Sequence, residues 1–137
     1  MTAPASPPPT TDSARPLLTG IGQIAIRATD LARAKAFYRD VLGLRFLFEA
    51  PNLVFFQCGS VWLYLAGAET PEFDHAASVL YFDVEDIHAA HRVLTERGVH
   101  FRGEPHVVHQ DRDRALWMAF FDDSEGNVFA IRRWSSV

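Results

Sequence analysis

The sequence predicts an α+β fold made of two copies of a strand–helix–three-strand (βαβββ) module, whose strands together form a cup-shaped mixed sheet. Two observations predict this fold: a helical pattern occurs twice along the chain, and strand-like apolar segments surround each copy. With 137 residues, of which 48% are hydrophobic and 22% charged, the chain has the length and composition of one compact domain rather than two.

The two helical segments, residues 29–44 and 85–99, share one pattern. Each begins beside an aspartate, Asp30 or Asp86, which can accept hydrogen bonds from the free N–H groups of the first turn. Each ends at a glycine suited to the left-handed conformation that follows a last helical turn. Between these ends, apolar residues recur at helical spacing: Leu31, Ala34, Phe37, Tyr38 and Val41 in the first copy, and Ile87, Ala90, Val93 and Leu94 in the second.

Strand-like segments precede and follow both helices. They lie at residues 21–26, 44–49, 53–58 and 61–66 around the first helix, and at 78–84, 99–101 (continuing near 105–109), 115–121 and 127–133 around the second. We therefore place the first module at 18–67, a linker at 68–76 and the second module at 77–134, all within one domain. One helix covers only one face of a sheet, so the other faces must meet each other or a partner chain.

Residues 1–17 are rich in Pro, Ser, Thr and Ala and cannot build a core. We interpret them as a flexible Pro-rich tail, and we expect deletion of residues 1–15 to lower stability little. A proline-rich ligand for a partner domain is the alternative, based on Pro7, Pro8 and Pro9.

Composition also narrows the partners and the compartment. A net charge of −4 argues against nucleic acid as a partner, because binding of phosphates requires a basic surface. No apolar run reaches the length of a membrane span, and the N-terminus lacks the pattern of a signal peptide. Cys58 is the only cysteine, which excludes an intrachain disulfide. We expect a cytoplasmic protein that binds neither nucleic acid nor membranes.

Two stretches link the chain to a known family. Residues 30–44 read DLARAKAFYRDVLGL and residues 122–127 read DDSEGN; both resemble motifs of the vicinal oxygen chelate superfamily, which includes type I glyoxalases, bleomycin-resistance proteins and extradiol dioxygenases. The resemblance covers residues 19–134 and implies the cup-shaped fold and a homodimer. The second stretch suits a hairpin loop in which Gly126 takes a positive φ, and Ser124 stands where the family often has proline.

The resemblance also implies where a metal would bind, because metal-dependent members place one ligand on each of four strands. These positions fall on Gln23, Tyr64, Val79 and Ala130, and of the four only Gln23 is a metal ligand of the usual kind. A catalytic zinc needs about three protein ligands. A shift of one residue in the alignment does not restore the acids, since the neighbouring positions are also apolar: Leu63, Leu65, Phe129 and Ile131. We expect a degenerate metal site and no cofactor.

Strand alternation predicts what lines the cup instead, since residues two apart share a face. The predicted ligand-binding residues are Gln23, Trp62, Tyr64, Tyr81 and Arg132. An aromatic lining with an amide and a guanidinium suits a flat or amphipathic organic molecule. The alternative is that these aromatic side chains only fill a core.

His100, His106 and His109 form a second group of candidates. On a regular strand, His106 and His109 point to opposite faces, which favours structural or surface roles over a second metal site. A single histidine that acts as acid or base stays open.

Three functions remain. The first is non-enzymatic binding of a small organic molecule. The second is a metal-dependent glyoxalase-like lyase or isomerase, or a dioxygenase. The third is a metal-free isomerase or lyase that uses Gln23, Tyr64 or a nearby histidine.

Overall fold

The computed structural model describes residues 17–67, 72 and 74–137. The predicted tail, apart from Leu17, and much of the predicted linker lie outside the described residues. None of the described helices combines the length and the hydropathy that crossing a membrane requires.

The first module consists of β1 (Gln23–Arg27), α1 (Leu31–Ala36), η1 (Phe37–Val41), β2 (Arg45–Ala50), β3 (Leu53–Cys58) and β4 (Val61–Ala66). Its four strands form a sheet in the order β1-β4-β3-β2, in which β1 runs parallel to β4 and the other pairs are antiparallel. As predicted, the Asp30 carboxylate caps α1 by accepting a hydrogen bond from the Arg33 backbone N–H (3.1 Å). The helix α1 continues directly into the π-helix η1, which has a wider turn.

The second module repeats this topology. It consists of β5 (Tyr81–Asp83), α2 (Ile87–Glu96), β6 (His100–Phe101), β7 (His106–Gln110), β8 (Arg114–Asp122) and β9 (Val128–Ser136). The strand order is β5-β9-β8-β6, and β7 also pairs with β8. The predicted repeat is confirmed, because the first strand of each module runs parallel to its last strand. The predicted strand at 78–84 is shorter than expected and covers only Tyr81–Asp83.

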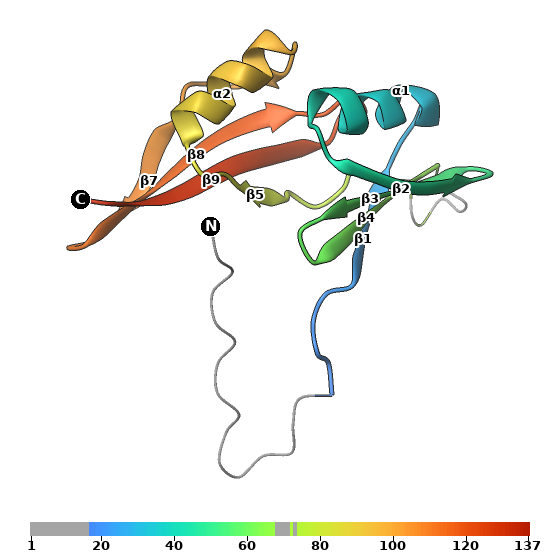
Figure 1. The fold of residues 1–137 in the computed structure, drawn as a ribbon, viewed down its shortest axis with the longest axis horizontal. Coiled ribbons are helices and arrows are strands. Elements are labelled where there is room, and N and C mark those ends of the chain that lie inside the picture. Colours follow the sequence, from blue (N-terminus) through green and yellow to red (C-terminus); the bar gives the residue numbers. More distant parts are fainter. Residues whose placement is uncertain (1–16, 68–71, 73) are drawn as a thin grey trace.

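Each helix packs on one face of its own sheet. The core beneath α1 includes Ile26, Phe56 and Leu65, and the core beneath α2 includes Phe121 and Phe129, all almost fully buried. Figure 1 shows both helices on the same side of the two sheets. Within the described residues, the opposite face of each sheet carries no helix, and we call these the helix-free faces.

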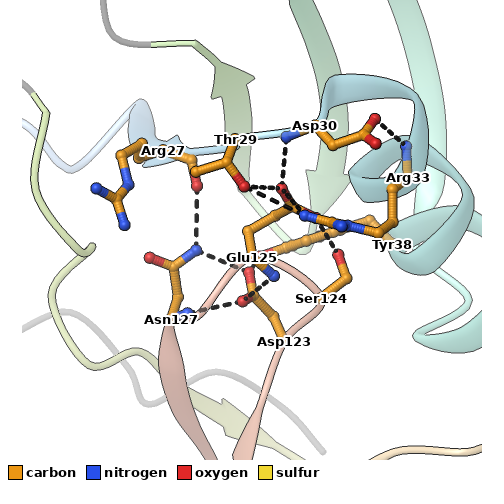
Figure 2. Close-up of polar contacts among 9 residues, drawn as sticks. All are labelled: Arg27, Thr29, Asp30, Arg33, Tyr38, Asp123, Ser124, Glu125 and Asn127. Atoms are coloured by element: carbon orange, nitrogen blue, oxygen red, sulfur yellow. Dashed lines mark hydrogen bonds and ion pairs between the residues drawn. The ribbon is translucent and has the colours of Figure 1, made fainter.

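The hairpin between β8 and β9 joins the two modules (Figure 2). Gly126 in this turn has the predicted positive φ of 82°. The buried carboxylate of Glu125 reaches the first module and accepts hydrogen bonds from Thr29 Oγ1 (2.9 Å), the Asp30 backbone N–H (2.7 Å) and Arg33 Nε (2.8 Å). The turn predicted from the sequence therefore also connects the two modules. We call its three buried polar residues, Asp123, Glu125 and Asn127, the hairpin clasp.

Asp123 and Asn127 complete this clasp from either end of the turn. Asp123 accepts hydrogen bonds from the backbone N–H groups of Glu125 and Asn127 (both 2.8 Å). The side chain of Asn127 accepts from the Ala77 backbone N–H (2.8 Å) and donates to the Arg27 carbonyl (3.1 Å). The side chains of Asp123, Glu125 and Asn127 are all buried. Their hydrogen bonds offset the free energy that burying polar groups costs.

Candidate ligand-binding site

The first group of predicted ligand-binding residues lies on the helix-free face of the four-stranded sheet. Gln23 pairs with Trp62 and Ala25 with Tyr64 in the parallel register of β1 and β4. Gln23, Trp62 and Tyr64 therefore share one face, as predicted. Gln23 is exposed and Tyr64 is half-buried.

Four aromatic side chains form a continuous cluster on this face, which we call the aromatic face: Phe48, Phe55, Trp62 and Tyr64. The rings of Phe48 and Phe55 stack at 4.7 Å between centroids, and Phe55 lies 5.6 Å from Trp62 and 5.0 Å from Tyr64. Phe48 remains 45% exposed and Trp62 39% exposed, so the cluster is an accessible surface and not a closed core.

Phe48 was not predicted to lie here, because strict alternation places Phe46 and Phe48 on one face. A β-bulge separates the two residues. Phe46 pairs with Phe56 but Phe48 pairs with Phe55, so Leu47 is the extra residue. The bulge turns Phe46 toward the helix, where Lys35 Nζ lies 4.9 Å from its ring centroid, and turns Phe48 toward the aromatic face.

Phe55 was also missed. The sequence offered a signal for it, because adjacent residues of a strand point to opposite faces and only one of Phe55 and Phe56 can enter the core. The structure buries Phe56 completely and pairs Phe55 with Tyr64.

Tyr81 and Arg132 lie on the helix-free face of the second sheet. Tyr81 is 49% exposed, and its ring makes an edge contact with Phe120 at 6.2 Å. Tyr81 and Phe120 are the two cross-strand neighbours of Ala130, and Ala130 has no exposed surface. Arg132 Nε donates to Asp83 Oδ1 at 2.8 Å.

A second arginine, Arg27, lies at the edge of the first sheet next to the module junction. Its Nη1 donates to Asp74 Oδ1 at 3.1 Å, while its buried Nε has no hydrogen-bond partner. Arg27 and Arg132 are therefore each held by one carboxylate, which leaves part of each guanidinium for a further acceptor.

The single chain does not bring the two groups of predicted residues together. In the described part of the chain, no hydrogen bond and no ring contact joins Gln23, Trp62 or Tyr64 to Tyr81 or Arg132. The expectation that the helix-free faces meet each other or a partner chain stays a prediction.

The four positions to which the resemblance assigns metal ligands do not supply a suitable set of donor atoms. Tyr64 packs against Phe55, Val79 is apolar, and Ala130 is buried between Tyr81 and Phe120. These positions offer one amide and one phenol, which is not the donor set of a catalytic zinc or a related divalent ion. Across residues 17–67, 72 and 74–137, no three His, Cys, Asp or Glu side chains are grouped for a metal.

The prediction that His106 and His109 point to opposite faces is wrong. The register of β7 shifts between Val107 and His109, so His106 pairs with Met118 and His109 with Leu116. Because Met118 and Leu116 are two residues apart on β8, the bulge places both histidines on one face. It is the helix-free face, since the adjacent Trp117 contacts His88 of α2.

Comparison with known proteins places the chain in a family. The family model of the glyoxalase/bleomycin resistance protein/dioxygenase superfamily matches residues 20–131. The uncharacterized protein YetH of Bacillus subtilis is 27% identical over 130 residues, which cover 85% of this chain and 99% of that protein. The metallothiol transferase FosB of Staphylococcus haemolyticus is 35% identical over 49 residues, only 36% of this chain and 35% of that enzyme.

Solved structures share the fold at lower identity. A superfamily member from Sphaerobacter thermophilus has a TM-score of 0.71 and 23% identity over 85% of this chain and 98% of that one. TnmS3, an antibiotic binding protein from Streptomyces sp. CB03234, has a TM-score of 0.70 and 21% identity over 88% of this chain and 100% of that one. The repeated module, the DDSEGN hairpin and the matching family model lead to one conclusion: this chain belongs to the glyoxalase/bleomycin resistance protein/dioxygenase superfamily.

Proposed function

We propose that this protein binds a small, flat organic molecule on the aromatic face without chemical turnover. The observation that carries the proposal is the contiguous cluster of Phe48, Phe55, Trp62 and Tyr64 on a sheet face that no helix covers. Exposed aromatic clusters mark interaction sites more often than isolated exposed residues do. A planar ligand can stack on such rings with about 0.5–1.5 kcal/mol per ring pair beyond the burial of area.

Binding is favoured over metal catalysis by the side chains at the four ligand positions. The family's acid position on the last strand is Ala130, a buried methyl group, and no oxygen or nitrogen ligand stands there. TnmS3 has the same fold and is an antibiotic binding protein, which supports the idea that this scaffold can serve binding alone.

We further propose that a homodimer covers the open faces. Phe48, Trp62, Val79 and Tyr81 are each 39–49% exposed, and covering such side chains contributes about 25 cal/mol per Å² of apolar area removed from water. A second chain can place the face that carries Tyr81 and Arg132 over the aromatic face of the first. Arg132 would then supply a cation for ligands that carry an anionic group.

The experiment is a titration with anilinonaphthalene sulfonate, a flat aromatic anion, followed by tryptophan fluorescence. We expect saturable quenching, because Trp62 lies within the aromatic face. Trp62→Phe should remove most of the quenching. Trp117→Phe is the matched control and should retain it, since Trp117 lies on the helix side with its Nε1 bonded to Ser135 Oγ at 3.1 Å.

Two further variants separate the contributions to binding. Tyr64→Ala should weaken binding by about 1–2 kcal/mol through loss of aromatic contact while the protein stays folded. Arg132→Ala should weaken binding of the sulfonate but not of a neutral naphthalene. Unchanged quenching in Trp62→Phe, or no saturable binding by any member of a broad aromatic panel, would refute the proposed site.

Light scattering tests the dimer independently. The chain mass is 15.4 kDa, and we expect twice this mass at micromolar concentration. A monomer mass would leave the aromatic face open to solvent and argue against a shared site.

A further inference from the structure

A pocket of about 190 Å³ lies at the junction of the two modules. Its first-module wall comes from Leu42 and Leu44, which follow η1, and from Cys58 at the end of β3. Its second-module wall includes Phe82, Val84 and Leu94. Leu94 belongs to α2 and Phe82 packs on Phe121 and Phe129 of the core, so the pocket lies on the helix-bearing side.

Two polar contacts join the modules that form this pocket. The Glu125 carboxylate accepts a hydrogen bond from Arg33 Nε at 2.8 Å. Arg97 Nη1 donates to the Val41 carbonyl at 3.0 Å and so connects the end of α2 to the end of η1, next to the pocket residues Leu94 and Leu42 in the sequence. These contacts fix how the two walls of the pocket face each other.

The lining disfavours an anionic ligand. The walls are aliphatic and aromatic apart from Cys58 and Asp83, and the Asp83 carboxylate is already engaged by Arg132 at 2.8 Å. Burial, together with the nearby charge of Asp83, raises the pKa of the Cys58 thiol, so the thiol stays neutral near pH 7. A neutral thiol behaves as a small apolar group.

We infer that this junction pocket binds a small neutral apolar molecule the size of a single aromatic ring, independently of the aromatic face. The size follows from the volume, because an apolar cavity of about 150 Å³ accommodates benzene. The occupant contacts both modules at once, and its binding therefore stabilises their present arrangement by linkage.

Cys58 provides the test, because it is the only cysteine in the chain and lines the pocket. Alkylation of Cys58 by iodoacetamide is followed by mass spectrometry in the presence of increasing toluene. Toluene at about ten times its dissociation constant leaves about one protein molecule in ten free, so alkylation should slow about tenfold. Benzoate, the anionic analogue, should give no protection.

Two variants locate the protection. Leu44→Phe fills the pocket and should abolish protection by toluene; Leu94→Phe is the second filling variant if the first does not fold. Trp62→Phe alters the aromatic face and should leave the protection intact. The inference is overturned if toluene does not slow alkylation of the wild-type protein up to its aqueous solubility, or if benzoate protects equally. It is also overturned if protection disappears in Trp62→Phe or persists in a folded filling variant.

Discussion

The hydroxyl of Tyr38 donates a 2.6 Å hydrogen bond to Oδ2 of Asp123, a residue 85 positions further along the chain. Tyr38 belongs to the π-helix of the first module and is fully buried, while Asp123 begins the hairpin of the second (Figure 2). Burial is the larger cause and the negative charge of Asp123 the second, and together they raise the pKa of Tyr38 well above its ordinary range. The phenol therefore stays protonated, and remains a hydrogen-bond donor, at neutral and moderately alkaline pH.

Tyr38→Phe should lower the free energy of unfolding by about 1–3 kcal/mol, because it removes the donor and leaves a buried carboxylate oxygen with one partner fewer. Urea unfolding followed by circular dichroism measures this loss. Tyr64→Phe is the control and should change stability by less than about 0.5 kcal/mol, as substitutions outside buried networks do. Equal stability of the two variants would show that the Tyr38–Asp123 bond does not support the module junction.

Glu125→Gln should lower the free energy of unfolding by about 2–3 kcal/mol at pH 7, because a fully buried carboxylate loses its ion pair with Arg33 and hydrogen bonds to a charged acceptor contribute more than neutral ones. Glu96→Gln is the matched control, since Glu96 is an exposed residue of α2. If Glu125→Gln lost no more stability than Glu96→Gln, the result would contradict the role of Glu125 in joining the modules.

Acid should weaken the same clasp. Burial alone raises the pKa of Glu125, but hydrogen bonds from Arg33, Asp30, Ser124 and Thr29 outweigh it and lower the pKa from 4.5 to about 2. A lowered pKa means that the ionised side chain stabilises the fold above pH 4.5 and that this contribution is lost as the pH falls toward 2. At about 1.4 kcal/mol per pKa unit, the loss is up to about 3 kcal/mol.

Unfolding free energies measured between pH 6 and pH 2 test this dependence. The wild-type protein should lose stability steeply over the lower part of this range, and Glu125→Gln should lose distinctly less. Parallel curves for the two proteins would assign the acid sensitivity to other carboxylates.

The bulge in β2 predicts opposite effects for two neighbouring phenylalanines. Phe46→Ala should lower stability by about 2–4 kcal/mol, because Phe46 packs on the buried Phe56 at 5.9 Å and large-to-small changes at a core leave a cavity. Phe48→Ala should lower stability by less than about 1 kcal/mol, as at other exposed positions, but weaken binding of anilinonaphthalene sulfonate. Thermal unfolding and fluorescence titration of both variants separate these effects.

A chelator should leave this protein unchanged. Protein purified without a metal-affinity tag should contain no stoichiometric transition metal by mass spectrometry, and excess EDTA should leave its Tm unaltered, because the four family positions hold one amide, one phenol and two apolar side chains. Near-unit zinc, nickel, manganese or iron would contradict the proposed degenerate site. It would direct attention to His106 and His109, which the β7 bulge places on one face.

The elements that local interactions control could be predicted closely. Asp30 and Asp86 cap the helices as expected, with hydrogen bonds of 3.1 and 3.0 Å to Arg33 N and Ala89 N. Helix capping and the positive φ of Gly126 depend on residues within one turn of each other, so the sequence contains the information directly. The shared face of Gln23, Trp62 and Tyr64 could also be predicted, because β1 and β4 have no bulge.

The sequence by itself determined the two modules, the capped helices and the DSEGN turn, since each of these depends on residue type or on short-range spacing. The missing acid at Ala130 stays a prediction from the family resemblance. Only the tertiary structure decided that Phe48 joins the aromatic face, that His106 and His109 share a face, and that Glu125 binds Arg33. The position of a bulge depends on the register with the paired strand. The ion pair between Arg33 and Glu125 joins residues 92 positions apart and forms only once both modules are packed. The bulges depend on the pairing with a neighbouring strand and the ion pair on contact between the modules, and neither is encoded in the local periodicity of the sequence.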